Sequence, residues 1–252
     1  MHDGGRENKM QDIRILTEGD SSLLIVFGNE VSPDINKKIS AVVSLFRSQQ
    51  IKGVVDLIPS YCALLINYNP AVTTFSEIKK RAEQILSMDV KTSDEKKVIV
   101  EIPVCYGGDY GPDIQKIADN AGLTVQEVID LHSSRDYLIY MLGFLPGFCY
   151  LGGLDERIHT PRLANPRLKI REGSVGIGGA STGIYPMDSP GGWQLMGMTP
   201  VKTFDADREV PILLEAGQYI RFIPITEEEF IEIRKKVEAG EYECVVHVEG
   251  GE

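Results

Sequence analysis

The feature that most constrains the fold of this chain is the stretch from 143 to 200, where glycine and proline recur every few residues. It begins with GFLPGFCYLGG (143–153) and holds many of the chain's 25 glycines and 13 prolines. Both residue types interrupt long helices and long strands, so the stretch predicts short strands joined by turns. Short strands that are interrupted by glycine and proline favour a β-barrel or sandwich with functional loops.

The N-terminal third of the chain has a different pattern, in which amphipathic helices alternate with apolar strands. Apolar side chains recur at helical spacing in the two helical segments, and β-branched and aromatic residues fill the strands. The predicted segments are strand 21–28, helix 34–50, two strands within 53–69, helix 73–88 and strand 96–106. Strand, helix, strand, strand, helix, strand is the order of a ferredoxin-like domain.

A polar stretch at 90–95 separates this region from the rest of the chain. We therefore predict an α+β protein with a small ferredoxin-like domain over 11–92 and a β-barrel domain over 96–246. The first 14 residues contain no apolar segment of the kind found in signal peptides, and we leave their start out of the fold prediction.

Three helices are predicted in the second domain, over 111–122, 124–134 and 227–240. Thr124 is followed three residues later by Glu127, which is the spacing of a capping box at a helix start. The last helix ends at a glycine, as helices often do.

Composition excludes several classes of protein. The formal net charge of −11 argues against nucleic acid as a partner, and no apolar run reaches the roughly 20 residues of a membrane span. The cysteines at 62, 105, 149 and 244 contain no C-x-x-C pair, so no zinc site or other metal site is predicted. We expect reduced thiols in a cytoplasmic protein, with a reactive Cys149 as the alternative.

A basic segment stands out on this acidic chain. On a strand, Arg167, Lys169 and Arg171 would share one face, and like charges at that spacing require an anion or acidic groups opposite. Residues 141–202 contain six Lys/Arg and four acidic residues, a window charge of +2, which leaves −13 for the rest. The segment is either an anion site, with Arg162 just upstream, or an ordinary solvated strand face.

Two further stretches could shape a site. GSVGIGGASTG (173–183) lacks the Lys-Ser/Thr of a P-loop and the third glycine of a dinucleotide fold, but its amides could bind an anion. The alternative is a glycine-rich strand and turn. YPMDSPGGW (185–193) flanks prolines and glycines with aromatic rings, and either holds a defined shape or only turns between strands. His132 and His159 could shuttle protons or be structural.

The motifs GFLPGFCYLGGL, NPR, GSVGIGG, TGIYP, SPGGWQLMGMTP and EAGQYIRF occur in an order that resembles the family of 5-oxoprolinase B subunits. This family is homologous to the sporulation-kinase inhibitor KipI. Its module also occurs in urea carboxylase and in proteins described as allophanate hydrolase subunit 1. The resemblance implies a ferredoxin-like domain followed by a cyclophilin-like β-barrel. Members often carry a glutamine where this chain has Ser181.

The resemblance also implies a function: ATP-dependent opening of 5-oxo-L-proline to L-glutamate, together with subunits A and C. A divalent ion such as Mg²⁺ would assist, and this chain alone would be inactive. The alternatives are a KipI-like inhibitor of a sensor histidine kinase and, by fold analogy alone, a prolyl isomerase.

The resemblance and the residue patterns together assign site residues in three groups. The catalytic group is Arg162, Arg167 and His132. Substrate or nucleotide would contact a rigid, uncharged wall of Gly143, Phe144, Pro146, Gly147, Tyr150, Gly178, Gly179, Thr182, Tyr185 and Pro186. The partner subunit would contact Pro190, Gly191, Gly192 and Trp193.

Overall fold

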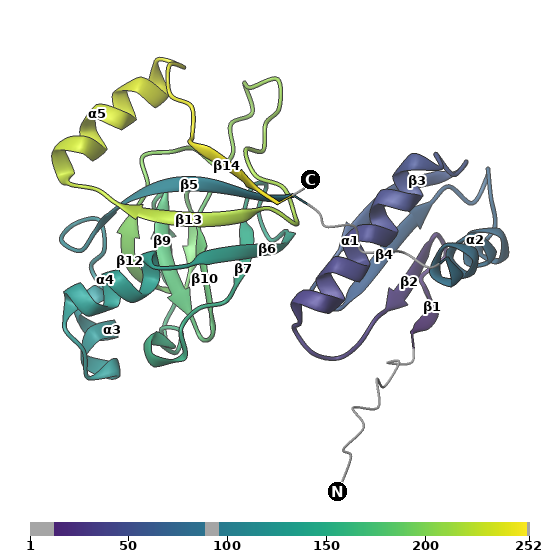
Figure 1. Cartoon of the computed structure of the whole chain (residues 1–252), viewed down its shortest axis with the longest axis horizontal. Helices are drawn as coiled ribbons and strands as arrows, with labels where there is room; N and C mark the ends of the chain where they lie inside the picture. Colours follow the sequence, from purple (N-terminus) through teal and green to yellow (C-terminus); the bar gives the residue numbers. More distant parts are fainter. Residues whose placement is uncertain (1–12, 89–95, 251–252) are drawn as a thin grey trace, which may run out of the picture. The chain divides into compact units, whose positions relative to one another are not determined.

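The computed structural model describes residues 13–88 and 96–250. The chain divides into two compact units, 1–93 and 94–252, each with its own apolar core (Figure 1). The predicted α+β class is confirmed, with a ferredoxin-like unit followed by a cyclophilin-like barrel.

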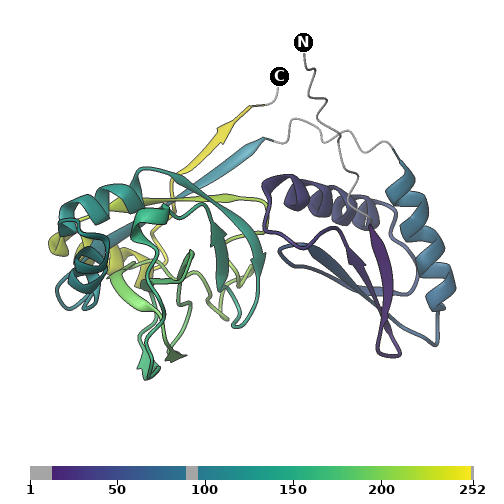
Figure 2. The same ribbon diagram turned by 90° about the horizontal axis from the view of Figure 1, so that it is seen from below.

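The first unit is a four-stranded antiparallel sheet with two helices on one face (Figures 1 and 2). Its elements are β1 (Arg14–Glu18), β2 (Ser22–Val26), α1 (Pro33–Ser48), β3 (Val54–Pro59), β4 (Ala63–Tyr68) and α2 (Phe75–Ser87). The sheet order is β1-β2-β4-β3. Alternate strand residues such as Leu23 and Ile25 are fully buried against the apolar stripe of α1, which includes Ile39. The alternating apolar residues of the strands and the apolar stripe of the helix are therefore buried in one core.

The ferredoxin-like order is completed by a strand that the sequence prediction missed. The predicted last strand, 96–106, belongs to the barrel, and β1 takes its expected sheet position beside β2. β1 pairs along its length with β2 through a hairpin at Gly19, which has a φ of 63°. Ile15 then packs against the core of the unit, although most of β1 is exposed. The sequence prediction missed β1 because most of its residues are polar.

The second unit is a closed seven-stranded barrel. Its strands are β5 (Lys97–Tyr106), β6 (Asp136–Leu142), β7 (Cys149–Gly152), β9 (Ser174–Gly178), β10 (Ser181–Ile184), β12 (Gln194–Met198) and β13 (Tyr219–Pro224). They follow the order β12-β9-β10-β7-β6-β13-β5, and β12 also pairs with β5, which closes the barrel. β13 runs parallel to β5, whereas the other pairs are antiparallel.

Two further pieces of β-structure lie outside this barrel. β8 (Arg167–Ile170) and β11 (Ser189–Gly191) form a separate two-stranded ribbon. β14 (Val246–Glu249) pairs with the first half of β5 (Figure 1). The predicted helices are present as α3 (Ile114–Ala121), α4 (Val125–Ser133) and α5 (Glu227–Glu238), and a short 3-10 helix spans Glu156–Ile158.

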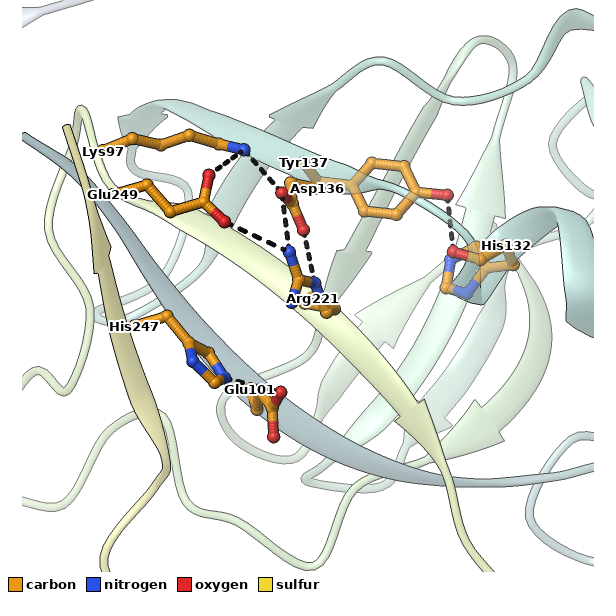
Figure 3. A network of polar contacts seen from close by, with 8 residues as sticks. All are labelled: Lys97, Glu101, His132, Asp136, Tyr137, Arg221, His247 and Glu249. Carbon is orange, nitrogen blue, oxygen red and sulfur yellow. Dashed lines mark hydrogen bonds and ion pairs between the residues drawn. The ribbon is translucent and has the colours of Figure 1, made fainter.

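A polar network ties β5, β6, β13 and β14 together (Figure 3). The largely buried Asp136 carboxylate accepts from Lys97 Nζ at 2.6 Å and from Arg221 Nε at 2.7 Å. Glu249 of β14 lies 3.3 Å from Lys97 Nζ. Because Asp136 accepts from two cations, its burial is compensated, and the network fixes the strands around it.

The predicted capping box of α4 is confirmed: Glu127 N donates to Thr124 Oγ1, and Thr124 N donates to the Glu127 carboxylate. We expect Thr124→Ala to lower the free energy of unfolding by about 1 kcal/mol, because the backbone amide of Glu127 loses its acceptor, the Thr124 hydroxyl. Thr124→Ser, which keeps the hydroxyl, is the control. Equal urea midpoints for the Ala and Ser variants would contradict this role.

Candidate functional site

The run GFLPGFCYLGG places Phe148 at the centre of an aromatic cluster. Phe148 makes edge-to-face contacts with four rings, those of Phe144, Tyr150, Tyr185 and Trp193, at centroid distances of 5.1 to 5.6 Å. We call these five residues the aromatic cluster. Phe148, Tyr185 and Trp193 are buried in it, together with Ile170 of the β8–β11 ribbon. The predicted wall is therefore a packed surface of rings.

The aromatic cluster lies on the outer wall of the barrel. Along β9 and β10, Ile177 and Ile184 belong to the barrel core, so the alternate residues Gly178 and Gly183 point outward. An added Cβ at Gly183 would lie 3.1 Å from the Trp193 ring, and one at Gly178 would overlap the indole. The two glycines therefore make room for Trp193 against the strands.

Phe144 is the exposed member of the aromatic cluster. Its side chain is 64% exposed, and its backbone has a φ of 67°, a conformation that aromatic residues rarely adopt. Neighbouring Pro146 is also exposed, and Gly147 has a φ of 79° with the backbone of Thr203 close by. The loop thus holds an aromatic ring in solvent on a constrained backbone, which suits a contact surface.

Arg162 lies over the aromatic cluster, with its guanidinium carbon 5.9 Å from the centre of the Trp193 ring. Three hydrogen bonds hold its segment against the barrel: Gly179 N donates to Thr160 O, Gln194 Nε2 to Pro161 O, and Leu163 N to Gly192 O, at 2.7 to 2.9 Å. Arg162 itself is exposed. A positive charge is therefore presented on a fixed backbone above an apolar ring.

The cations of the predicted basic segment are satisfied inside the chain. Arg167 donates to Asp113 at 2.7 Å, Lys169 lies 2.7 Å from Asp188, and Arg171 donates to the carbonyl of Asp109. Acidic groups thus face the basic strand, which was one of the two arrangements that its charge required. Within 13–88 and 96–250, Arg162 has a ring contact and no ion pair.

Arg167 also connects the site to the first helix of the barrel unit. Its second nitrogen donates to the carbonyl of Trp193 at 3.4 Å, and Asp113, just before α3, accepts from the backbone amide of Leu195. Arg167 therefore lies beside the aromatic cluster as a positioning residue for β12. Asp113 and Gln194 were missed from the sequence, because their partners lie 82 and 33 positions away and no local motif marks either residue.

The glycine-rich stretch forms the hairpin of β9 and β10, with Gly179 at the turn and a φ of 68°. The amide of Gly179 donates to Thr160, and that of Tyr185 donates to Ser174. The strand-and-turn alternative describes this geometry. Nucleotide contact by Gly178, Gly179 and Pro186 stays a prediction, and Pro186 is buried.

His132 lies on the opposite side of β10 from Arg162, inside the barrel. Tyr106 Oη lies 2.8 Å from its Nδ1, and Thr182 Oγ1 lies 2.8 Å from its Nε2. Because Thr182 donates its own proton to Gly176 O at 3.0 Å, it must accept from Nε2. A neutral imidazole protonated on Nε2 then accepts from Tyr106 at Nδ1, and both ring nitrogens are satisfied.

The electrostatics of His132 agree with this assignment. Complete burial, and secondarily the charge of Arg135, lowers the pKa of His132 from 6.5 to about 3. The ring also stacks on Phe222 at 4.5 Å. The structure does not bring His132 together with Arg162, so the geometry favours a structural role, and its catalytic role stays a prediction.

Cys149 is buried in the barrel core. Burial raises the pKa of the Cys149 thiol to about 12, so this cysteine is not an activated nucleophile.

The predicted partner contacts differ in exposure. Pro190 is exposed and Gly191 and Gly192 are half-buried, whereas Trp193 is 4% exposed. A partner could touch the first three directly and reach Trp193 through Arg162.

The residues described by the structure contain no group of three or more His, Cys, Asp or Glu side chains arranged to hold a metal ion. Among the same residues, no helix is both long enough and apolar enough to cross a bilayer.

The same architecture occurs in known proteins. The family model "Carboxyltransferase domain, subdomain C and D" matches residues 13–214. The urea amidolyase of K. lactis superposes with a TM-score of 0.77 at 22% identity, over 94% of this chain and 16% of that chain. The structure of TTHA0988 has a TM-score of 0.73 at 31% identity, over 81% of this chain and 40% of that chain. The fold and the match define a carboxyltransferase-domain protein.

Within this class, the most informative relative is the 5-oxoprolinase B subunit of Bacillus subtilis (strain 168). It is 39% identical over 222 residues, which cover 84% of this chain and 92% of the relative. The chain belongs to the family of 5-oxoprolinase B subunits, as its motifs predicted.

The buried His132 predicts a specific pH dependence of stability. Between pH 6.5 and about 3 the unfolded chain binds a proton at this residue that the folded chain does not. The free energy of unfolding therefore falls with decreasing pH, by up to about 1.4 kcal/mol per pH unit from this group. We expect His132→Gln to show a shallower fall in urea titrations between pH 6.5 and 4. Equal slopes in the two proteins would contradict a neutral buried imidazole.

Trp193 is the single tryptophan, so its fluorescence reports on this site alone. Gly178→Ala would force the indole away from β9, and we expect red-shifted emission and a loss of about 1 to 3 kcal/mol in the free energy of unfolding. The matched control is Gly143→Ala, whose methyl would lie 3.8 Å from the Tyr150 ring, an ordinary contact. Emission unchanged in both variants would contradict the close packing of Trp193.

Proposed function

We propose that this chain is one subunit of a multi-chain, ATP-dependent 5-oxoprolinase that opens 5-oxo-L-proline to L-glutamate with subunits A and C. The observation that carries the proposal is its 39% identity across 92% of a 5-oxoprolinase B subunit. A protein of this kind is a component of a hydrolase complex, and activity in isolation is not expected. We place it in the cytoplasm, because all four cysteines are free thiols.

The groups around the site support a contribution that another chain must complete. Arg162 offers one positive charge to an anionic group, such as a carboxylate or a transferred phosphoryl oxygen. The aromatic cluster beneath it is uncharged and excludes water. His132 is not placed to act as a general base beside Arg162, since it points into the barrel core. The exposed Phe144 and Pro146 are available for contact with a partner subunit.

The described residues of this site do not by themselves fit a nucleoside triphosphate. A bound triphosphate needs several cations or free amides, but Arg167 is paired with Asp113 and the Gly179 amide already donates to Thr160. In the proposed complex the partner subunits supply the remaining charge.

The proposal is tested by reconstitution. The three purified subunits are mixed with 5-oxo-L-proline, ATP and Mg²⁺, and glutamate release is followed with and without this chain. We expect glutamate release only from the complete mixture. A mixture without this chain that releases glutamate at the same rate would contradict the proposal.

Arg162→Ala in the reconstituted complex tests the site. Removal of a positioned charge from an apolar surface should lower the rate of glutamate release by about tenfold or more. The matched control is Arg157→Ala, which removes another exposed arginine five residues upstream, where Asp155 keeps its contact with Arg135. Equal rates for the two variants would contradict the role of Arg162.

A further inference from the structure

The sheet of the first unit has a second face that α1 and α2 do not cover. The helices pack on the face that carries Leu23, Ile25, Leu64 and Ile66, all of which are fully buried. Residues that alternate with these point to the opposite face. We call it the open face.

One apolar row crosses all four strands of the open face. Leu16 of β1 pairs with Leu24 of β2, Leu24 with Leu65 of β4, and Leu65 with Ile58 of β3. Directly paired residues share a face of the sheet, so these four side chains form one continuous strip. The end members Leu16 and Ile58 are 42% and 40% exposed. An uncovered apolar row of this length is typical of an interaction surface.

The ionised residues of the open face lie on either side of this row and differ in sign. Arg14 pairs with Val26 on one side, whereas Glu18 pairs with Ser22 on the other. The exposed Asp56 of β3, which pairs with Asn67, lies on the same side of the row as Glu18. Arg14 and Glu18 are both exposed and are both on β1, two residues from Leu16 in opposite directions. The face is thus positive at one end of β1 and negative at the other.

This arrangement is complementary to itself. If a two-fold axis runs along the apolar row, it places the row of one copy on the row of a second copy and reverses the strand direction. Arg14 of each copy then lies opposite Glu18 of the other, so that each dimer contains two equivalent charge pairs. We propose that the open face is a homodimer interface in which two such sheets pack face to face about this axis.

The size of the open face sets the strength of the contact. Four strands about 4.8 Å apart and five residues long give a face of roughly 20 by 17 Å. This is smaller than the roughly 800 Å² per partner of a standard interface, so we expect a dimer that dissociates in the micromolar range. Both Arg14–Glu18 pairs lie at the rim, where charge decides which partner and which orientation are accepted.

Sedimentation equilibrium of the full chain from about 1 to about 200 µM tests the proposal. The wild type should convert from monomer to dimer over this range. Arg14→Glu and Glu18→Arg should each raise the dissociation constant by about tenfold, because each places like charges opposite one another twice. The combined Arg14→Glu/Glu18→Arg chain should return to within about threefold of the wild type.

The charge-matched control is Lys37→Glu on α1, an exposed position away from the open face, which should leave the constant unchanged. Leu16→Asp, in the apolar row, should leave a monomer at every concentration, and circular dichroism checks that it remains folded. A wild type that stays monomeric throughout, or a double variant as weak as the singles, would overturn the proposed interface.

Discussion

The packing of the Trp193 indole against two glycines on the outer wall of the barrel is the contact on which the site depends. Gly178 and Gly183 remove the side chains that would otherwise hold the ring away from β9 and β10. Phe148 and Tyr185 then pack edge-to-face on the indole, and Arg162 lies over it. Without this contact the rings would have no common surface and Arg162 would have no support.

β10 separates two environments that the sequence places side by side. Thr182 points inward to His132, and its neighbour Gly183 points outward to Trp193. The inner side is a closed chain of hydrogen bonds around a neutral imidazole, and the outer side presents a fixed positive charge to solvent. The inner network stabilises the strand that carries the site.

The sequence predicted those features that depend on local pattern. The helices and the α4 capping box follow from apolar periodicity and from the Thr-x-x-Glu spacing, which operate within a few residues. β1 was missed because it is short and largely polar, and it is fixed by pairing with β2 rather than by its own composition. The ferredoxin-like domain was predicted from the order of strands and helices in the N-terminal third, and the barrel from the glycine and proline spacing of 143–200. The family was identified from the order of motifs between 143 and 222.

The site was predicted in composition but not in arrangement. Four of the five rings, Gly178 and Arg162 were assigned to the site, but the central Phe148 and Gly183 were not. The pairing of Arg167 with Asp113 spans 54 positions and has no local signal. The glycines of 173–183 were interpreted either as an anion site or as a strand and turn, and Gly178 and Gly183 also accommodate the ring of Trp193, which directly precedes β12. Which side chain fills such a space is decided by barrel closure, which brings β12 beside β9.

We propose that a partner subunit covers the Arg162 surface on the outer wall of the barrel. This contact can be detected by amide hydrogen exchange of this chain, measured before and after mixing with the partner subunits. Exchange should become slower in the loops at 143–148 and 160–165 upon mixing, with the strands of the barrel core unchanged. Unaltered exchange in both loops within an assembled, active complex would contradict it.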